Sequence, residues 1–158
     1  MTDSAPDRPA RSLPQLFADR RRWFEEALFG SMERAGERPV TAAQAAVFAV
    51  LDDGGTSISE LARRIGVARQ TAHQAVHGLV RMGLLEQVPD PASARSSLIR
   101  MTPDGARVHR RALATLDVIE DVLVERLGAD AVTALRAALA APWGAPPVVE
   151  APGGDASG

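Results

Sequence analysis

The sequence predicts a mainly α-helical domain that carries one small β-hairpin. Three observations predict this fold class: apolar residues recur at helical spacing over most of the chain, glycine and proline separate these runs, and two short strand-like runs flank a proline-containing turn. With 158 residues, 46% of them hydrophobic, the chain is long enough for one core and too short for two. We therefore expect a single domain over residues 12–141.

The two ends of the sequence lack the periodicity of its middle. Residues 1–11 and 142–158 are rich in proline, glycine, alanine and aspartate, which predicts disordered tails. The N-terminus has no apolar stretch typical of a signal peptide, and no run of eighteen apolar residues occurs, so we expect a cytoplasmic protein without a membrane span. The absence of cysteine excludes disulfides and thiolate metal sites.

The first two helices are bounded by capping signals. Apolar residues recur at helical spacing over residues 13–32 and predict a helix that ends near Gly36. Thr41 and Gln44 fit a capping box that opens a second helix, which we expect over residues 40–55 because two glycines close that stretch.

A third, short helix is predicted to begin at Ser57 or Ser59 and to stop at Gly66. Only the three residues Val-Ala-Arg separate it from the next helical pattern, which Gly83 ends. Two short helices joined by so tight a turn form a helix-turn-helix, in which the second helix can project from the body of the domain.

The fourth helix has two different faces. At 100° per residue, its apolar side chains fall on one side, namely Ala72, Ala75, Val76, Leu79 and Met82. The opposite face consists of hydrogen-bonding side chains, namely Gln70, His73, Gln74, His77 and Arg81. Glutamine can pair with adenine edges and arginine with guanine edges, and first-turn residues such as Arg69 and Thr71 are where groove-reading helices contact DNA. We interpret this face as a DNA-reading surface.

The charge distribution supports the same interpretation. The chain has a net charge of −2, but residues 60–111 carry nine arginines against four acids, a local charge of +5 that leaves −7 for the remainder. No acidic residue lies between Glu60 and Glu86, whereas solvated helix faces usually carry several. A basic block inside an acidic protein is typical of a site for a polyanion.

A hairpin is predicted directly after the helix-turn-helix, in the position of a wing. Residues 84–88 and 97–101 are the strand-like runs, and PDPASAR between them is the turn. Arg95 lies near the tip, where it could enter a minor groove.

Two more helices complete the chain. Thr102 supplies an N-cap and Pro103 a first-turn proline for a long helix over about 103–127, and a last helix follows over about 129–141. The apolar excess on the first and the last two helices is more than the helix-turn-helix could cover, which predicts a homodimer.

Three segments carry a resemblance to a known family: ELARRIGVARQTAHQAVHGLVRMGLLE, the wing ending in Arg95, and LIRMTPDGARV. In their order and spacing, residues 12–141 resemble a MarR-type winged helix-turn-helix transcriptional regulator. The resemblance implies dimerisation through helices in 12–36 and 103–141, and a winged-helix DNA-binding part over 41–102. Each recognition helix would then enter a major groove of double-stranded DNA, one helical turn from its symmetry mate, on a pseudo-palindromic operator.

The resemblance also implies a repressor that releases DNA when a small aromatic or anionic ligand binds between the dimer region and the DNA-binding part. By position it makes Arg69, Thr71, His73 and Gln74 reading residues and Arg95 the wing arginine.

Three departures change these expectations. Ser93 stands where an acid usually braces the wing. Ala68 replaces a capping serine, a loss of about 1 kcal/mol. Gln74 replaces a frequent arginine and favours adenine over guanine.

Other functions have less support in the sequence. His73 and His77 are spaced i, i+4 and could hold a transition metal, but His109 lies in another helix, so we expect no metal and no cofactor. No nucleophile with its base and no phosphate-cradling loop is present, so we expect no enzyme. A winged helix that binds protein instead of specific DNA stays an alternative.

Trp23 is expected to pack or form dimer contacts, and is also a candidate for lining an effector pocket.

Overall fold

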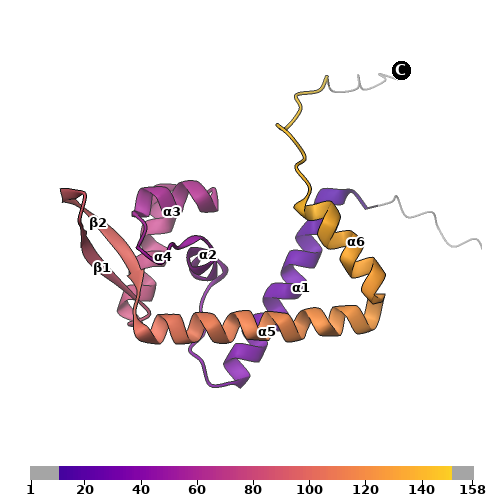
Figure 1. The fold of residues 1–158 in the computed structure, drawn as a ribbon, viewed down its shortest axis with the longest axis horizontal. Coiled ribbons are helices and arrows are strands. Elements are labelled where there is room, and N and C mark those ends of the chain that lie inside the picture. Colours follow the sequence, from indigo (N-terminus) through magenta and orange to yellow (C-terminus); the bar gives the residue numbers. More distant parts are fainter. Residues whose placement is uncertain (1–10, 151–158) are drawn as a thin grey trace, which may run out of the picture. The chain divides into compact units, whose positions relative to one another are not determined.

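The computed structural model describes residues 11–150 and confirms a mainly helical fold with one antiparallel hairpin (Figure 1). The elements follow in the order α1 (Leu13–Arg34), α2 (Ala42–Val50), α3 (Ile58–Ile65), α4 (Arg69–Arg81), β1 (Leu85–Asp90), β2 (Ser93–Met101), α5 (Pro103–Leu127) and α6 (Ala129–Ala140). The chain divides into two compact units, one ending at Glu120 and the other beginning at Asp121. Of the predicted tails, residues 1–10 and 151–158 lie outside the described part, and residues 142–150 contain no helix or strand.

Helix α1 begins and ends where local signals place it. The backbone N–H of Ser12 donates to the side chain of Gln15, which is half of a capping box. At the other end the N–H groups of Gly36 and Glu37 donate to the carbonyls of Glu33 and Met32, at 2.9 and 3.0 Å. This pair of hydrogen bonds is a Schellman motif, and it fixes the direction in which the chain leaves α1.

Helix α2 confirms its predicted start but ends earlier than predicted. The capping box is present, with Gln44 N–H donating to the Thr41 hydroxyl at 3.2 Å and Thr41 N–H donating to the Gln44 side chain at 2.9 Å. The helix ends at Val50 and does not reach the glycines at 54 and 55, so the predicted boundary was wrong. The cause is long-range pairing, because Thr56 exchanges two backbone hydrogen bonds with Ile99 of β2.

The helix-turn-helix is formed by α3 and α4. The Ser57 hydroxyl accepts a hydrogen bond from Glu60 N–H at 3.3 Å and caps α3, which decides between the two predicted starts. Gly66, in the left-handed conformation, ends α3, and α4 follows after two residues. As predicted, Ala68 provides no side-chain cap for α4.

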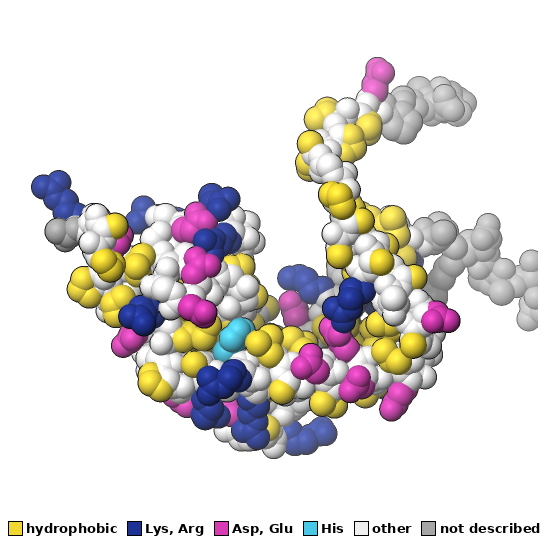
Figure 2. Space-filling model, viewed as in Figure 1, with side chains coloured by type: hydrophobic (Ala, Val, Ile, Leu, Met, Phe, Trp, Pro, Cys, Tyr) yellow, Lys and Arg dark blue, Asp and Glu magenta, His cyan; other side chains and the backbone are white. Residues whose placement is uncertain are grey.

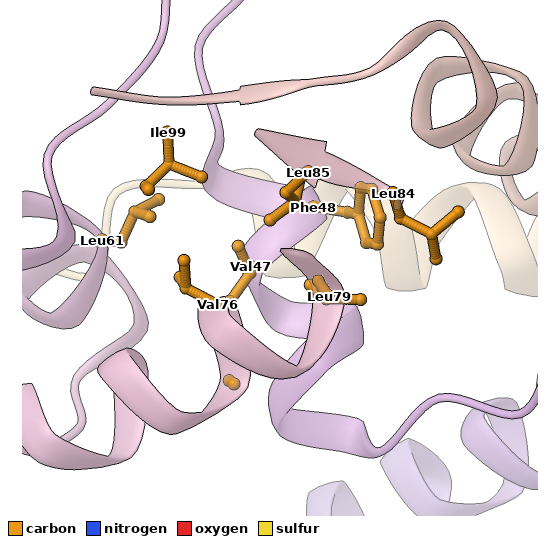
Figure 3. Close-up of a cluster of buried hydrophobic side chains, with 9 residues drawn as sticks. Val47, Phe48, Leu61, Val76, Leu79, Leu84, Leu85 and Ile99 are labelled. Carbon is orange, nitrogen blue, oxygen red and sulfur yellow. The ribbon is translucent and has the colours of Figure 1, made fainter. Parts of the chain in front are cut away.

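The core lies between α2, α3, α4 and the base of the hairpin, where the side chains in Figure 3 converge. The predicted apolar face of α4 is buried there, apart from the half-buried Met82. The cluster consists of Val47, Phe48, Leu61, Ala75, Val76, Leu79, Leu84, Leu85 and Ile99. Burial of this face leaves the opposite side of α4 as its outer surface.

The hairpin is longer than predicted. Leu85 pairs with Met101, and the register continues regularly to Pro89 opposite Ser97, with an irregularity before Asp90. Most of the predicted turn PDPASAR is therefore strand, and residues 91 and 92 connect β1 to β2.

The base of the hairpin is closed by Thr102, the residue just before α5. The Thr102 hydroxyl accepts a hydrogen bond from Gly105 N–H at 3.0 Å and donates one to the Gly83 carbonyl at 2.6 Å. Its backbone N–H donates to the Leu84 carbonyl at 3.1 Å. A Cβ at Gly105 would lie 1.9 Å from the Leu84 oxygen, so only glycine permits this approach. Thr102 therefore joins the end of α4 to the start of α5.

In the second unit, α6 begins after Gly128 and ends at Ala140, close to its predicted boundaries. Its apolar side chains Leu135 and Leu139 are 45% and 50% exposed in the single chain. Among the described residues, no helix combines the length and apolarity that crossing a membrane would require.

Candidate nucleic-acid interface and effector cavity

The polar face of α4 is solvent-exposed over most of its length. Its side chains at Gln70, His73, Gln74 and Arg81 are exposed, and His77 is half-buried. The first-turn residues Arg69 and Thr71 are exposed as well. The seven predicted α4 residues thus lie on a solvent-accessible part of the helix, and the other face of α4 is buried in the core.

His73 and His77 lie against each other on this face. Their ring centroids are 4.1 Å apart, with the ring planes inclined by 43°. Over residues 11–150, no three histidine or carboxylate side chains gather as a metal centre would require. His109, the remaining histidine, lies on α5.

Part of the basic block is neutralised by ion pairs on α3. Arg63 and Arg64 contact the Glu60 carboxylate at 2.6 and 2.8 Å, and Arg64 also contacts Asp52 at 2.8 Å. Hydrogen bonds from Arg63 and then Arg64 lower the pKa of Glu60 from 4.5 to about 2. Arg64 thereby links α3 to Asp52 at the α2–α3 corner, whereas Arg63 is paired within α3.

A second network neutralises arginines on α5. The Glu37 carboxylate, whose side chain is 9% exposed, contacts Arg107 at 2.6 Å and Arg111 at 2.8 Å. Arg107 also contacts Asp104 at 2.8 Å. Hydrogen bonds from Arg107 and then Arg111 lower the pKa of Glu37 from 4.5 to about 2, against the effect of desolvation.

The remaining arginines of the block make no ion pair with any described residue; they are Arg69, Arg81, Arg95, Arg100 and Arg110. Four of these five lie on α4 and β2. The positive charge that is left for a partner is therefore concentrated on the helix and the wing. Figure 2 shows basic side chains at the far end of the hairpin.

The wing carries its own brace, which sequence reasoning missed. Arg95 is exposed on β2, as predicted for a wing-tip arginine. The Asp90 carboxylate accepts hydrogen bonds from Ala92 N–H at 2.9 Å and from the Ser96 hydroxyl at 2.7 Å. These two hydrogen bonds lower the pKa of Asp90, the one from Ser96 more strongly. The local signal was an aspartate two residues before a turn N–H, an Asx turn.

A cavity of about 110 Å³ opens between α1, α2 and the first half of α5. Its walls are mainly apolar and include Leu28 and Met32 from α1, Phe48 from α2 and Val108 from α5. His109 stacks on Phe48 with ring centroids 5.7 Å apart and an angle of 13° between the ring planes. Burial lowers the pKa of His109 and so favours its neutral form.

Three charged residues also line this cavity: Glu33, Glu37 and Arg38. Glu37 is engaged by α5, as described above. The Arg38 guanidinium donates a hydrogen bond through Nη2 to the carbonyl of Met82, the C-cap residue of α4. Sequence reasoning missed both residues because their partners are 44 or more positions away.

Trp23 is not among the residues that line the cavity. Its ring packs edge-on against Phe24, with centroids 5.0 Å apart and ring planes at 88°. Trp23 is on the same helix as the lining residue Leu28, one to two turns before it. Its role in ligand binding stays a prediction.

Comparison with known proteins agrees with the family resemblance of the sequence. A sequence model of the MarR family matches residues 39–96. The PcaV transcriptional regulator from Streptomyces coelicolor, solved in complex with its natural ligand, is 30% identical to this chain. That match covers 86% of this chain and 94% of PcaV, with a TM-score of 0.61.

Two further similarities were found. The transcriptional repressor CouR, solved bound to a 23-mer DNA duplex, is 24% identical, with 88% and 97% of the two chains covered and a TM-score of 0.72, a likeness in fold. An uncharacterised protein of Mycobacterium tuberculosis is 29% identical over 117 residues, which are 71% of this chain and 82% of that protein.

Proposed function

This chain belongs to the MarR family of winged helix transcription regulators, and from this premise we propose that it is a homodimeric repressor of transcription. In this proposal each α4 reads one half of a pseudo-palindromic operator in double-stranded DNA. A small aromatic or anionic ligand in the cavity between α1, α2 and α5 weakens the binding and releases the DNA.

One observation carries the proposal: the outer face of α4 consists of hydrogen-bond donors and acceptors without an acid, and all of them are exposed except the half-buried His77. Glutamine and arginine on such a helix can form paired hydrogen bonds with base edges in a major groove. The proposed reading residues are Arg69, Gln70, Thr71, His73, Gln74, His77 and Arg81, with Arg95 of the wing against the backbone or the minor groove.

The sorting of the arginines adds to this support. An arginine that is already paired with a carboxylate contributes little net positive charge to DNA binding. Within residues 60–111, the unpaired arginines are instead concentrated on α4 and β2, so the positive charge that this block leaves unpaired lies on the same elements as the proposed reading residues.

Dimerisation is proposed from the apolar side chains that a single chain leaves exposed. On α1, Leu13 is 66% and Phe17 39% exposed, and on α6, Leu135 is 45% exposed. Contiguous apolar residues on helix surfaces are usually covered in an assembly. Two reading helices in one dimer would also bind a two-part operator more tightly than one domain could.

The relatives support the two remaining parts of the proposal. CouR is named a repressor and was solved on DNA, and PcaV was solved with its natural ligand. In this chain, the apolar cavity with a neutral, stacked His109 and the cation Arg38 at its lining suits a small ring with an acidic or hydrogen-bonding group.

The test is fluorescence anisotropy of the protein on the DNA upstream of its own gene and on a scrambled duplex, over a series of salt concentrations. We expect preferential binding to the upstream DNA with a steep negative salt dependence. Equal or absent binding to both duplexes would contradict the proposal and favour a protein-binding winged helix. A chelator control tests the His73–His77 alternative, since loss of binding with chelator would indicate a metal-responsive regulator.

A further inference from the structure

We infer that Arg38 transmits the occupancy of the cavity to the recognition helix α4. This inference rests on the proposed function and adds to it the residue that couples its two sites. Arg38 combines two properties: it lines the cavity, and its guanidinium is hydrogen-bonded to the end of α4. A ligand that attracts this guanidinium therefore acts on α4 through a single side chain.

The acceptor of this hydrogen bond is a group that helices leave unsatisfied. The last carbonyls of an α-helix have no partner inside the helix, and a cation near them also interacts favourably with the helix dipole. The Met82 carbonyl is such a group, because Met82 is the C-cap of α4. Arg38 thus contributes to holding the C-terminal end of the recognition helix in place.

The segment that carries Arg38 is itself fixed. The Schellman motif at the end of α1 sets the backbone at Gly36 and Glu37, and the Glu37 carboxylate is held by Arg107 and Arg111 of α5. Two adjacent residues therefore attach the α1–α2 connection to different helices: Glu37 to α5, and Arg38 to α4.

The hydrogen bond to Met82 can be exchanged for a stronger one. Among the described residues, Arg38 contacts no carboxylate within ion-pair distance, and its acceptor at Met82 is a neutral carbonyl. Charge-assisted hydrogen bonds to a carboxylate are roughly twice as strong as neutral ones and can be bidentate with arginine. A carboxylate in the cavity would therefore draw the Arg38 guanidinium away from α4.

Loss of this contact would reorient α4 without unfolding it. The Gly83 and Leu84 carbonyls, just beyond Met82, stay hydrogen-bonded to Thr102 at 2.6 and 3.1 Å. Thr102 would then act as the pivot and the Met82 side as the part that moves. A small rotation at the end of α4 moves its first turn, where Arg69 and Thr71 lie, relative to the groove.

The experiment measures operator affinity for the wild type and for Arg38→Ala, each with and without ligand. The probes are benzoate, phenylacetate and cinnamate, each compared with its neutral amide. For the wild type we expect the acids to weaken operator binding and the amides to have a much smaller effect. For Arg38→Ala we expect about tenfold weaker binding without any ligand and less than a twofold further change with the acids.

Two variants and one structural measurement complete the design. Arg34→Ala removes an exposed arginine that does not line the cavity, and should keep the wild-type operator affinity and the response to the acids. Arg38→Lys keeps the charge and should restore part of the response. Hydrogen exchange should show faster exchange of the amides at 82–84 in Arg38→Ala, and in the wild type when an acid is bound.

The outcomes separate the inference from the function on which it rests. If Arg38→Ala matched the wild type in amide exchange at 82–84, in operator affinity and in its response to the acids, the inference would be overturned. The proposed repressor function would be unaffected. Equal effects of acids and amides on the wild type, or no effect of either, would overturn the carboxylate exchange. Absence of operator binding by the wild type would refute the proposed function, and the exchange rates at 82–84 would still test the contact between Arg38 and α4.

Discussion

The Ser96 hydroxyl donates a 2.7 Å hydrogen bond to the Asp90 carboxylate and so fastens β2 to the end of β1 at the tip of the wing. We predict that Ser96→Ala makes the tip more mobile and weakens binding to any DNA duplex about threefold to tenfold. Ser97→Ala is the matched control, because Ser97 is hydrogen-bonded to Gln87 instead of Asp90. Anisotropy and amide exchange of residues 92–96 check this prediction, and equal effects of the two variants would contradict it.

Gln74 is exposed in the middle of the polar face of α4, where a base edge would be within reach. Gln74→Ala should cost about 1–3 kcal/mol of binding free energy on the operator and little on random DNA. Titrations on both duplexes at one salt concentration measure the difference. Equal losses on the two would show that Gln74 does not read sequence.

Arg95 is exposed on the wing and makes no ion pair with a described residue. Arg95→Ala should weaken binding to specific and random DNA alike, and should lower the slope of log affinity against log salt by about one unit. Arg63→Ala serves as the control, because Arg63 is paired with Glu60. An unchanged slope for Arg95→Ala would remove the wing arginine from the set of phosphate contacts.

The lowered pKa of Glu37 predicts how the stability of the fold depends on pH. Its pKa is lowered from 4.5 to about 2 in the folded protein, so the carboxylate is stabilised by Arg107 and Arg111. A depressed pKa adds stability that is complete above about pH 4.5 and is lost as the pH falls towards 2. The difference in melting temperature between the wild type and Glu37→Gln should therefore be largest at neutral pH and vanish near pH 2. A constant difference over this range would rule out the ion pairs as its source.

The dimer can be tested through α6. Leu135 and Leu139 are about half exposed, so replacing both with glutamate should leave the single chain folded. Sedimentation equilibrium at micromolar concentration should give a dimer for the wild type and a monomer for the double variant. Val148→Glu is the control, because Val148 is fully exposed outside the helices and should not affect assembly. A monomeric wild type would overturn the proposed dimer.

Helix boundaries were predictable wherever the signal is local. Thr41 with Gln44 and Thr102 with Pro103 begin helices where their side chains can cap the first turn, and the structure has α2 and α5 beginning there. The end of α2 was missed because Thr56 pairs with Ile99, 43 residues further along the chain, an interaction that no local pattern encodes.

The candidate site was predictable in part for the same reason. The period of α4 alone separates its buried side from its polar side, so the sequence is enough to predict which residues lie on each side. Which arginines are free for DNA was not predictable, because it depends on Glu37 and Asp52, which are distant in sequence from the residues they neutralise. The cavity and the role of Arg38 depend on the packing of α1, α2 and α5 and could not be derived from a linear pattern.

The hydrogen bonds of Thr102 make the hairpin a closed loop with its own boundary. Residues 83 and 84 are tied to residue 102, so the ends of the wing are held together whatever lies between them. Changing the length of such a loop at its tip costs mainly loop entropy, which grows slowly with the number of residues. The wing can therefore be exchanged as a cassette: grafting a different tip between β1 and β2 would change contacts with DNA while α4 and α5 keep their places.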